Sequence, residues 1–252
     1  MIRLINVTKR YGDLTAVDAL NLEIRAGEIF GFLGPNGAGK TTTIRMMMGI
    51  LIPTGGHVLL GGYDVGREPE KAKALSGFIP DRPFLYEKLS GSEFLHFVGK
   101  LHYVSSALRQ QRIEHLLTHF ELLRWQDELI EGYSHGMKQR LALCAALIHE
   151  PRVLIVDEPM VGMDPRGART LKDLFRSLAE EGKTVFLSTH SIEVAQEVCH
   201  RIGIIQKGRL IACGTMAELH AQANNHDGGL ESVFLQLTEE KLAVDVQARS
   251  FQ

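Results

Sequence analysis

Residues 34–41, Gly-Pro-Asn-Gly-Ala-Gly-Lys-Thr, have the composition and spacing of a loop that binds phosphate. They fit the pattern G-x-x-x-x-G-K-[ST], in which glycines let the backbone fold with its N–H groups pointing inward. The N-terminus of a helix that follows such a loop adds a positive dipole. We expect Lys40 to contact the β- and γ-phosphates of a nucleotide and the Thr41 hydroxyl to ligate Mg²⁺. The segment therefore predicts a nucleoside triphosphate site.

Two acidic residues, Asp157 and Glu158, directly follow the apolar segment 153–156. Ligands of open α/β sheets bind at the carboxyl ends of the strands, where these acids would lie. Asp157 would hold Mg²⁺ through its water shell, and Glu158 could orient the attacking water and accept its proton. The alternative is that the two charges only cap a loop.

A histidine follows a second apolar segment, residues 184–187, after Ser188 and Thr189. At the same sheet edge, His190 could donate a hydrogen bond to the γ-phosphate. A purely structural histidine is the other interpretation.

The elements that must position these side chains alternate between strand and helix patterns. Apolar segments at 29–33, 153–156, 184–187 and 202–205 read as strands, with helices expected at 39–48, after Pro165 and from Ile192. This order predicts an α/β fold with a mainly parallel, helix-flanked sheet. Short strands joined by tight turns over the first 33 residues predict an antiparallel β subdomain.

A helical insertion interrupts the predicted sheet. From about residue 84 to 148, apolar residues recur at steps of three and four, as in Leu108, Ile113, Leu116 and Leu117. We therefore expect a nucleotide-binding core in two parts, 1–83 and 149–220, around a helical subdomain, 84–148. A polar linker and a last helix would fill 221–252.

Composition narrows the class of protein. The 252 residues contain 44% hydrophobic residues and 28 basic against 30 acidic side chains, which predicts no strong attraction to nucleic acid. No apolar run is long enough to span a membrane, and the first residues lack a signal pattern. Three cysteines at unrelated spacings indicate reduced thiols, and we expect a cytosolic chain.

Together these motifs resemble those of ABC ATPases, in order and spacing, over nearly the whole chain. Residues 34–42 resemble the Walker A loop and residues 153–158 the Walker B strand. The loop Gly162-Met163-Asp164 resembles the segment that crosses the family's dimer interface, and His190 resembles its switch histidine. Tyr11 resembles the aromatic residue that stacks on adenine. The resemblance assigns ATP binding to Tyr11, Gly34, Pro35, Asn36, Gly37, Ala38, Gly39, Lys40, Thr41 and Thr42.

The most specific motif is residues 133–140, Tyr-Ser-His-Gly-Met-Lys-Gln-Arg, which resembles the ABC signature. Ser134 would cap a helix running to about Ile148, so its hydroxyl and the first amides form an anion site. In the family that site, here Ser134, His135 and Gly136, binds the γ-phosphate of ATP held by the other subunit. The resemblance thus implies two ATPs sandwiched in a dimer, a homodimer being favoured.

Two departures from the family pattern bear on function. His135 and Met137 replace the usual glycine and glutamine of the signature, and the run Met-Lys-Gln-Arg is familiar from ATPases that serve exporter-like permeases. Asp81 stands where a glutamine is usual. It keeps an oxygen for Mg²⁺ but is shorter and adds a charge, so a metal-ligand role and a coupling role both stay open. In either case residues 81–86 should lie near the permease.

The resemblance implies an ATP-hydrolysing subunit that drives a separate polytopic permease from the cytoplasmic face of the membrane, with export favoured over import. The rival interpretation is an ABC ATPase that serves no transporter, for example in cofactor assembly. Translation factors of the family carry two ATPase halves in one chain and fit less well. Repair proteins of the family carry long coiled-coil or zinc insertions, whereas the helical insertion here is short and has neither heptads nor paired cysteines.

Overall fold

A computed structural model gives the structure of residues 1–160 and 165–223, and of the single positions 231, 232, 234 and 236. The expected interface loop at 162–164 and most of the expected linker and last helix, 224–237, lie outside these described residues.

The central element is a sheet of six strands within the described residues, in the order β10-β9-β3-β8-β7-β6. Five of them are parallel and the edge strand β10 is antiparallel. The strands are β3 (Ile29–Leu33), β6 (Ser76–Ile79), β7 (Val153–Asp157), β8 (Thr184–Thr189), β9 (Arg201–Gln206) and β10 (Arg209–Gly214). Because β3, β7 and β8 are buried along their whole length, they read in the sequence as continuous apolar runs.

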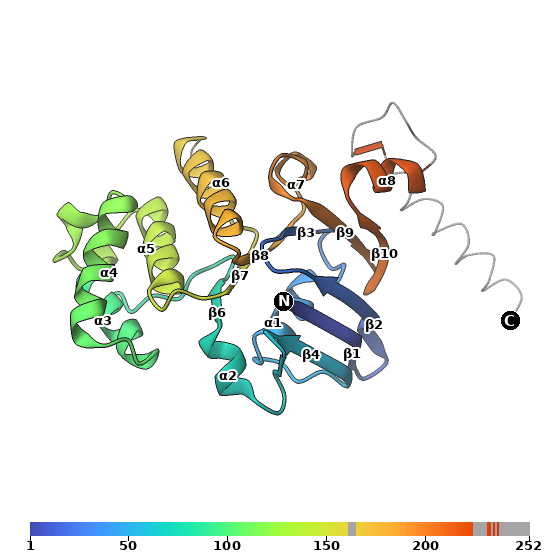
Figure 1. Ribbon diagram of the computed structural model, residues 1–252, viewed down its shortest axis with the longest axis horizontal. Helices are drawn as coiled ribbons and strands as arrows, with labels where there is room; N and C mark the ends of the chain where they lie inside the picture. Colours follow the sequence, from blue (N-terminus) through green and yellow to red (C-terminus); the bar gives the residue numbers. More distant parts are fainter. Residues whose placement is uncertain (161–164, 224–230, 233, 235, 237–252) are drawn as a thin grey trace, which may run out of the picture.

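The expected antiparallel subdomain forms a second sheet, in the order β2-β1-β4-β5 among the described residues. Its strands are β1 (Ile2–Tyr11), β2 (Leu14–Ile24), β4 (Gly55–Leu60) and β5 (Tyr63–Asp64). The helix α1 (Lys40–Met47) packs between this sheet and the parallel one (Figure 1). An apolar core that includes Phe30, Phe186 and Ile44 fills the space between them.

The insertion forms a helical lobe that projects from the β6–β7 side of the parallel sheet, at the left of Figure 1. It contains α3 (Gly91–Leu101), α4 (Ser106–His119), α5 (His135–Leu147) and the 3₁₀ turns η1 (Leu123–Trp125) and η2 (Ile130–Gly132). A second core joins this lobe to the sheet, with Leu141 of α5 and Phe175 of α6 (Pro165–Glu180) among its members. The lobe is therefore packed onto the sheet through a shared apolar core.

Shorter helices complete the fold: α2 (Pro69–Ala74), α7 (Ile192–Val198) and α8 (Met216–Gln222). The sequence patterns predicted α1, α6 and α7, but they predicted neither α2 nor the pair β10 and α8. Within the described residues, no helix combines the length and apolarity needed to cross a bilayer.

Candidate nucleotide and catalytic site

The predicted phosphate loop connects β3 to α1, at the carboxyl edge of the parallel sheet. Gly39 precedes α1 with φ at 111°, a left-handed conformation that favours glycine, and a Cβ there would lie 2.7 Å from the Ala16 carbonyl oxygen. At Gly34 a Cβ would lie 2.4 Å from the carbonyl oxygen of Ile205. The Gly208 amide donates to the Ala38 carbonyl at 2.8 Å. Neighbouring strands thus hold the loop in one shape that only glycine permits at these positions.

Lys40, the first residue of α1, extends back over this loop. Its ammonium donates to the carbonyl oxygen of Gly34 at 2.7 Å and lies 3.4 Å from Glu158 Oε1. The side chain is only 6% exposed. A buried cation held against this glycine-rich loop is suited to bind phosphate oxygens.

Asp157 ends β7 beside the N-terminus of α1, where Thr41 Oγ1 donates to its Oδ2 at 3.1 Å. On its other side, the Ser188 hydroxyl donates a short hydrogen bond to Oδ1. Burial raises the pKa of Asp157; the two hydrogen bonds oppose this shift, while the charges of Glu158 and Asp81 add to it.

The donor set formed by Thr41 and Asp157 fits Mg²⁺. A hydroxyl and a carboxylate are hard oxygen ligands, and a cation would offset the clustering of negative charge around Asp157. The described residues contain no cluster of three or more His, Cys, Asp or Glu side chains that could hold a metal. An ion at this place would thus complete its coordination with water and phosphate oxygens, as Mg²⁺ commonly does.

Glu158 and His190 meet one residue beyond the ends of β7 and β8. His190 Nδ1 lies 2.9 Å from Glu158 Oε2, and the His190 amide donates to the same oxygen at 3.3 Å. Glu158 has φ at 50°, a left-handed conformation that is uncommon for a non-glycine residue. The carboxylate is therefore fixed in position, with Lys40 on one side and His190 on the other.

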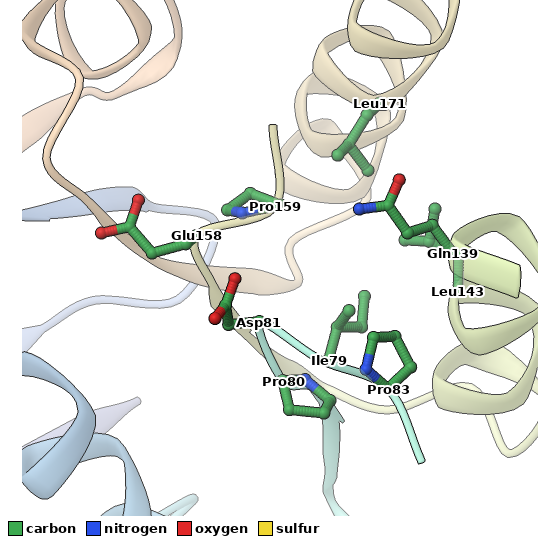
Figure 2. Close-up of a pocket in the computed structure, with 9 residues that line it drawn as sticks. All are labelled: Ile79, Pro80, Asp81, Pro83, Gln139, Leu143, Glu158, Pro159 and Leu171. Carbon is green, nitrogen blue, oxygen red and sulfur yellow. The ribbon is translucent and has the colours of Figure 1, made fainter. Parts of the chain in front are cut away.

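Asp81, the residue that replaces the usual glutamine, lies on the loop after β6 in a small pocket (Figure 2). Glu158 and Pro159 line the same pocket from the end of β7, and Gln139 enters it from α5. The Asp81 side chain is exposed, and it lies close enough to Asp157 for its charge to raise the pKa of that buried acid. Asp81 thus lies where the helical lobe meets the carboxyl edge of the parallel sheet.

The signature residues form the N-terminus of α5, in the helical lobe. Ser134 caps the helix, accepting a hydrogen bond from the Met137 amide at 3.3 Å, as its sequence position predicts. His135 is exposed, and a Cβ at Gly136 would have no atom within 4 Å. Because α5 lies in the lobe and α1 in the core (Figure 1), the structure does not bring the signature onto the phosphate loop of the same chain.

Tyr11 ends β1, where it pairs with Leu14 across the hairpin. Tyr11 is 48% exposed, and Lys9 Nζ lies 5.2 Å from the centre of its ring. The strand β2 continues from this hairpin to Ala16, whose carbonyl borders Gly39. An exposed aromatic ring therefore stands on the hairpin whose second strand borders the phosphate loop.

Residues 17–161 match the family described as ABC transporter, which is more than half of the 252 residues. The chain belongs to the ABC transporter family. Two curated relatives of this ABC transporter subunit are similar along most of its length. The linearmycin resistance ATP-binding protein LnrL of Bacillus subtilis (strain 168) is 39% identical, over 87% of this chain and 70% of the relative. The Nod factor export ATP-binding protein I of Paraburkholderia xenovorans (strain LB400) is 40% identical, over 85% of this chain and 71% of the relative.

Solved structures of the family agree with this fold. An ATP-binding subunit of an ABC transporter superposes with a TM-score of 0.90 at 29% identity, covering 94% of this chain and 99% of the other. The ATP-binding cassette MJ0796, dimeric and bound to ADP and Pi after hydrolysis, superposes with a TM-score of 0.78 at 28% identity, over 86% and 99% of the two chains. The chain is thus an ATP-binding, ATP-hydrolysing subunit of an ABC transporter.

One residue of this ABC cassette that the sequence did not single out is Ser188. The register of β7 on β8 places it opposite Asp157, and its hydroxyl bonds the buried carboxylate. In the sequence, Ser188 is marked only as a hydroxyl residue near the end of a mostly apolar strand. That mark identifies a partner for Asp157 only once the pairing of β7 with β8 is known.

Proposed function

We propose that two copies of this chain bind two ATP molecules between them and that their hydrolysis drives a separate membrane permease, in the direction of export. The observation that carries the proposal is the Glu158 carboxylate, which lies 2.9 Å from His190 and 3.4 Å from Lys40 at the edge that presents the phosphate loop.

In the proposed reaction, residues 34–42 surround the phosphates and Lys40 offsets negative charge on the β- and γ-phosphates. Thr41 and Asp157 would hold Mg²⁺, which when bound supplies further charge neutralisation. Glu158 accepts a proton from the attacking water, whose oxygen bonds to the γ-phosphorus as the bond to the β–γ bridging oxygen breaks. His190 holds the Glu158 carboxylate and donates to the γ-phosphate. Tyr11 stacks on the adenine.

The second half of each site comes from the other subunit in this proposal. Ser134, His135 and Gly136 present a capped helix N-terminus, which attracts anions, and they stand on a different lobe from the phosphate loop of their own chain. A head-to-tail pair of chains would bring each signature to the other chain's γ-phosphate. The dimeric relative bound to ADP and Pi supports this arrangement.

The chain is proposed to consist of an ATP-binding core, 1–83 and 149–220, a helical subdomain, 84–148, and a C-terminal linker and helix, 221–252. The permease is proposed to contact the junction between the core and the helical subdomain. Asp81 lies at this junction. The chain would then work as a peripheral protein on the cytoplasmic face. The named relatives, in linearmycin resistance and Nod factor export, favour export for this chain as well.

The test is to recover the affinity-tagged chain from detergent-solubilised membranes of the cells that express it. We expect a polytopic protein in fixed ratio to the chain, and an ATPase rate that differs between the complex and the isolated chain. An active ATPase found with no polytopic partner would instead favour the non-transport alternative.

A further inference from the structure

The lysine two residues before Tyr11 contacts the tyrosine ring. Lys9 Nζ lies over this ring, 5.2 Å from its centre, which is within the range of a cation–π interaction. Both residues belong to β1, and Tyr11 is the last residue of that strand. Tyr11 is 48% exposed, so the contact with Lys9 does not enclose it. The ammonium therefore restrains the tyrosine while leaving it accessible to a ligand.

A backbone carbonyl holds the Lys9 ammonium in this place. Lys9 Nζ donates to the carbonyl oxygen of Ile52 at 2.8 Å. The Lys9 side chain is half-buried, and a cation–π contact is stronger where the cation has lost part of its water than at a fully exposed site. The long side chain of Lys9 thus has two fixed contacts, one with the carbonyl and one with the ring.

The segment that supplies this carbonyl is itself fixed to β1 and to α1. The Thr54 amide donates to the Thr8 carbonyl at 2.8 Å, and the Arg10 amide donates to Thr54 Oγ1 at 3.0 Å. At the start of the segment, the Ile50 amide donates to the carbonyl of Arg45, a residue of α1, at 2.9 Å. The carbonyl that binds the ammonium therefore has a set place relative to both elements.

These contacts relate the position of the tyrosine ring to the phosphate loop. α1 begins at Lys40, directly after that loop, and the segment that follows α1 returns to β1 at Lys9. At the loop itself, a Cβ on Gly39 would lie 2.7 Å from the carbonyl oxygen of Ala16, on the strand that pairs with β1. The hairpin that carries Tyr11 is thus in contact with both ends of α1. A nucleotide whose phosphates bind the loop would meet a ring whose position is already set.

We propose that Lys9 is a positioning residue for the base of the nucleotide, and that it holds the Tyr11 ring in the orientation in which a purine stacks on the face opposite the ammonium. This inference rests on the proposed function, in which Tyr11 stacks on the adenine, and adds the residue that prepares the ring. A ring that is already oriented loses less freedom when the nucleotide binds, so the nucleotide is held more tightly. Lys9 acts through Tyr11, so it affects nucleotide binding and not the chemical step.

The first test compares a nucleotide with its phosphate chain alone, by titration calorimetry. Lys9→Met keeps an apolar stem without the ammonium and should weaken the binding of ADP by about fivefold. Inorganic pyrophosphate has no base and should bind the variant as tightly as it binds the unsubstituted chain. Lys9→Arg keeps a cation and should restore most of the affinity for ADP. Equal losses for ADP and pyrophosphate would overturn the proposal, and so would tighter binding of ADP by Lys9→Met, which would mean that Lys9 obstructs the ring.

Arg10→Met is the matched control. It removes the same charge from the next residue of β1, and Arg10 lies over no aromatic ring in the described part of the chain. The affinity of this variant for ADP should be unchanged. In steady-state assays, Lys9→Met should raise KM for ATP by the same factor as it weakens ADP binding and leave kcat unchanged, because the base contact is the same before and during the reaction. A lower kcat with an unchanged KM would contradict the positioning role.

A double-mutant cycle separates this inference from the assignment of Tyr11 to the adenine. Tyr11→Ala should weaken ADP binding by about thirtyfold and spare pyrophosphate. In that background Lys9→Met should have no further effect, because the ring through which Lys9 acts is gone. A loss that persists in the background would overturn the role of Lys9. If Tyr11→Ala weakens ADP binding and Lys9→Met does not, only the inference about Lys9 fails; if Tyr11→Ala has no effect, the adenine assignment fails and the inference fails with it.

Discussion

At the scale of single residues, the site depends on a few side chains held in strained or buried positions. Glu158 keeps a left-handed backbone conformation in which its amide donates to the Ser188 carbonyl at 3.1 Å. Such conformations cost on the order of 1 kcal/mol and persist where surrounding contacts enforce them. Here the contacts with Lys40 and His190 fix the carboxylate that the proposed mechanism needs.

Glu158→Gln tests that carboxylate. The amide keeps the size of the side chain but cannot accept the proton of the attacking water, so turnover should fall by about a hundredfold. ATP affinity should be unchanged, because Lys40 and the loop amides remain, and ATP-bound dimers should accumulate. Steady-state ATPase rates and size-exclusion profiles with ATP provide the measurement. Near-normal hydrolysis by the variant would show that Glu158 is not the general base.

Asp81→Asn separates a metal role from a coupling role. Asp81 is exposed and lines the pocket between α5 and the carboxyl end of β7. We therefore expect it to couple ATP hydrolysis to the permease. The isolated variant should then hydrolyse ATP at the normal rate across a range of Mg²⁺ concentrations, while the permease should no longer alter that rate. A defect of the isolated subunit that added Mg²⁺ restores would show instead that Asp81 is a metal ligand.

At the scale of elements, the sequence predicted those whose patterns are strong. β3, β7 and β8 are fully buried, so each stands out as an apolar run, and each ends at residues suited to phosphate or metal chemistry. By contrast, α2 spans six residues of which only Ala72 is buried, so no periodicity marks it. β10 is an edge strand of mixed exposure and was missed for the same reason.

Only some of the contacts between distant elements could be predicted from one sequence. The expected site residues of β3, β7 and β8 meet because the strands are parallel, which the alternation of elements implies. Ser188 joins them only through the register of one strand pair. The stacking of His102 on His149 depends on how the lobe packs on the core, which no local pattern records.

The His149 contact makes the stability of the lobe–core junction depend on pH. Burial lowers the pKa of His149 to about 4 in the folded protein, against an ordinary value of 6.5. A depressed histidine pKa means that the contribution to stability is present above pH 6.5 and is lost as the pH falls toward 4. Between pH 7.5 and 5 this group should cost about 2 kcal/mol of unfolding free energy.

Urea unfolding at the two pH values measures this cost. The Ser76 carbonyl lies 3.1 Å from His149 Nε2. The matched variant is His149→Gln, which keeps a donor for the Ser76 carbonyl but does not titrate, so the remaining groups give its pH dependence. We expect the loss of stability on acidification to be smaller in the variant by that amount. Equal losses in both proteins would mean that His149 does not drive the effect.

At the scale of the whole molecule, the two proposed halves of the ATP site lie on different parts of one chain. The phosphate loop and the acids proposed to be catalytic lie at the parallel sheet, and the signature lies on the helical lobe (Figure 1). In a two-fold dimer each half-site would be completed by the other chain, since a symmetric interface repeats every contact. We therefore propose that each ATP site is composite, built from residues of both chains.

Mixing two inactive variants tests that claim most directly. Lys40→Ala removes the phosphate-loop cation and Ser134→Arg blocks the signature, and each variant alone should be inactive. In an equal mixture half of the dimers are hybrids, and each hybrid contains one intact site, made from the loop of one chain and the signature of the other. If the two sites act independently, the mixture should recover roughly a quarter of the wild-type ATPase rate. Complete inactivity at every mixing ratio, or normal turnover by Ser134→Arg alone, would contradict the composite site.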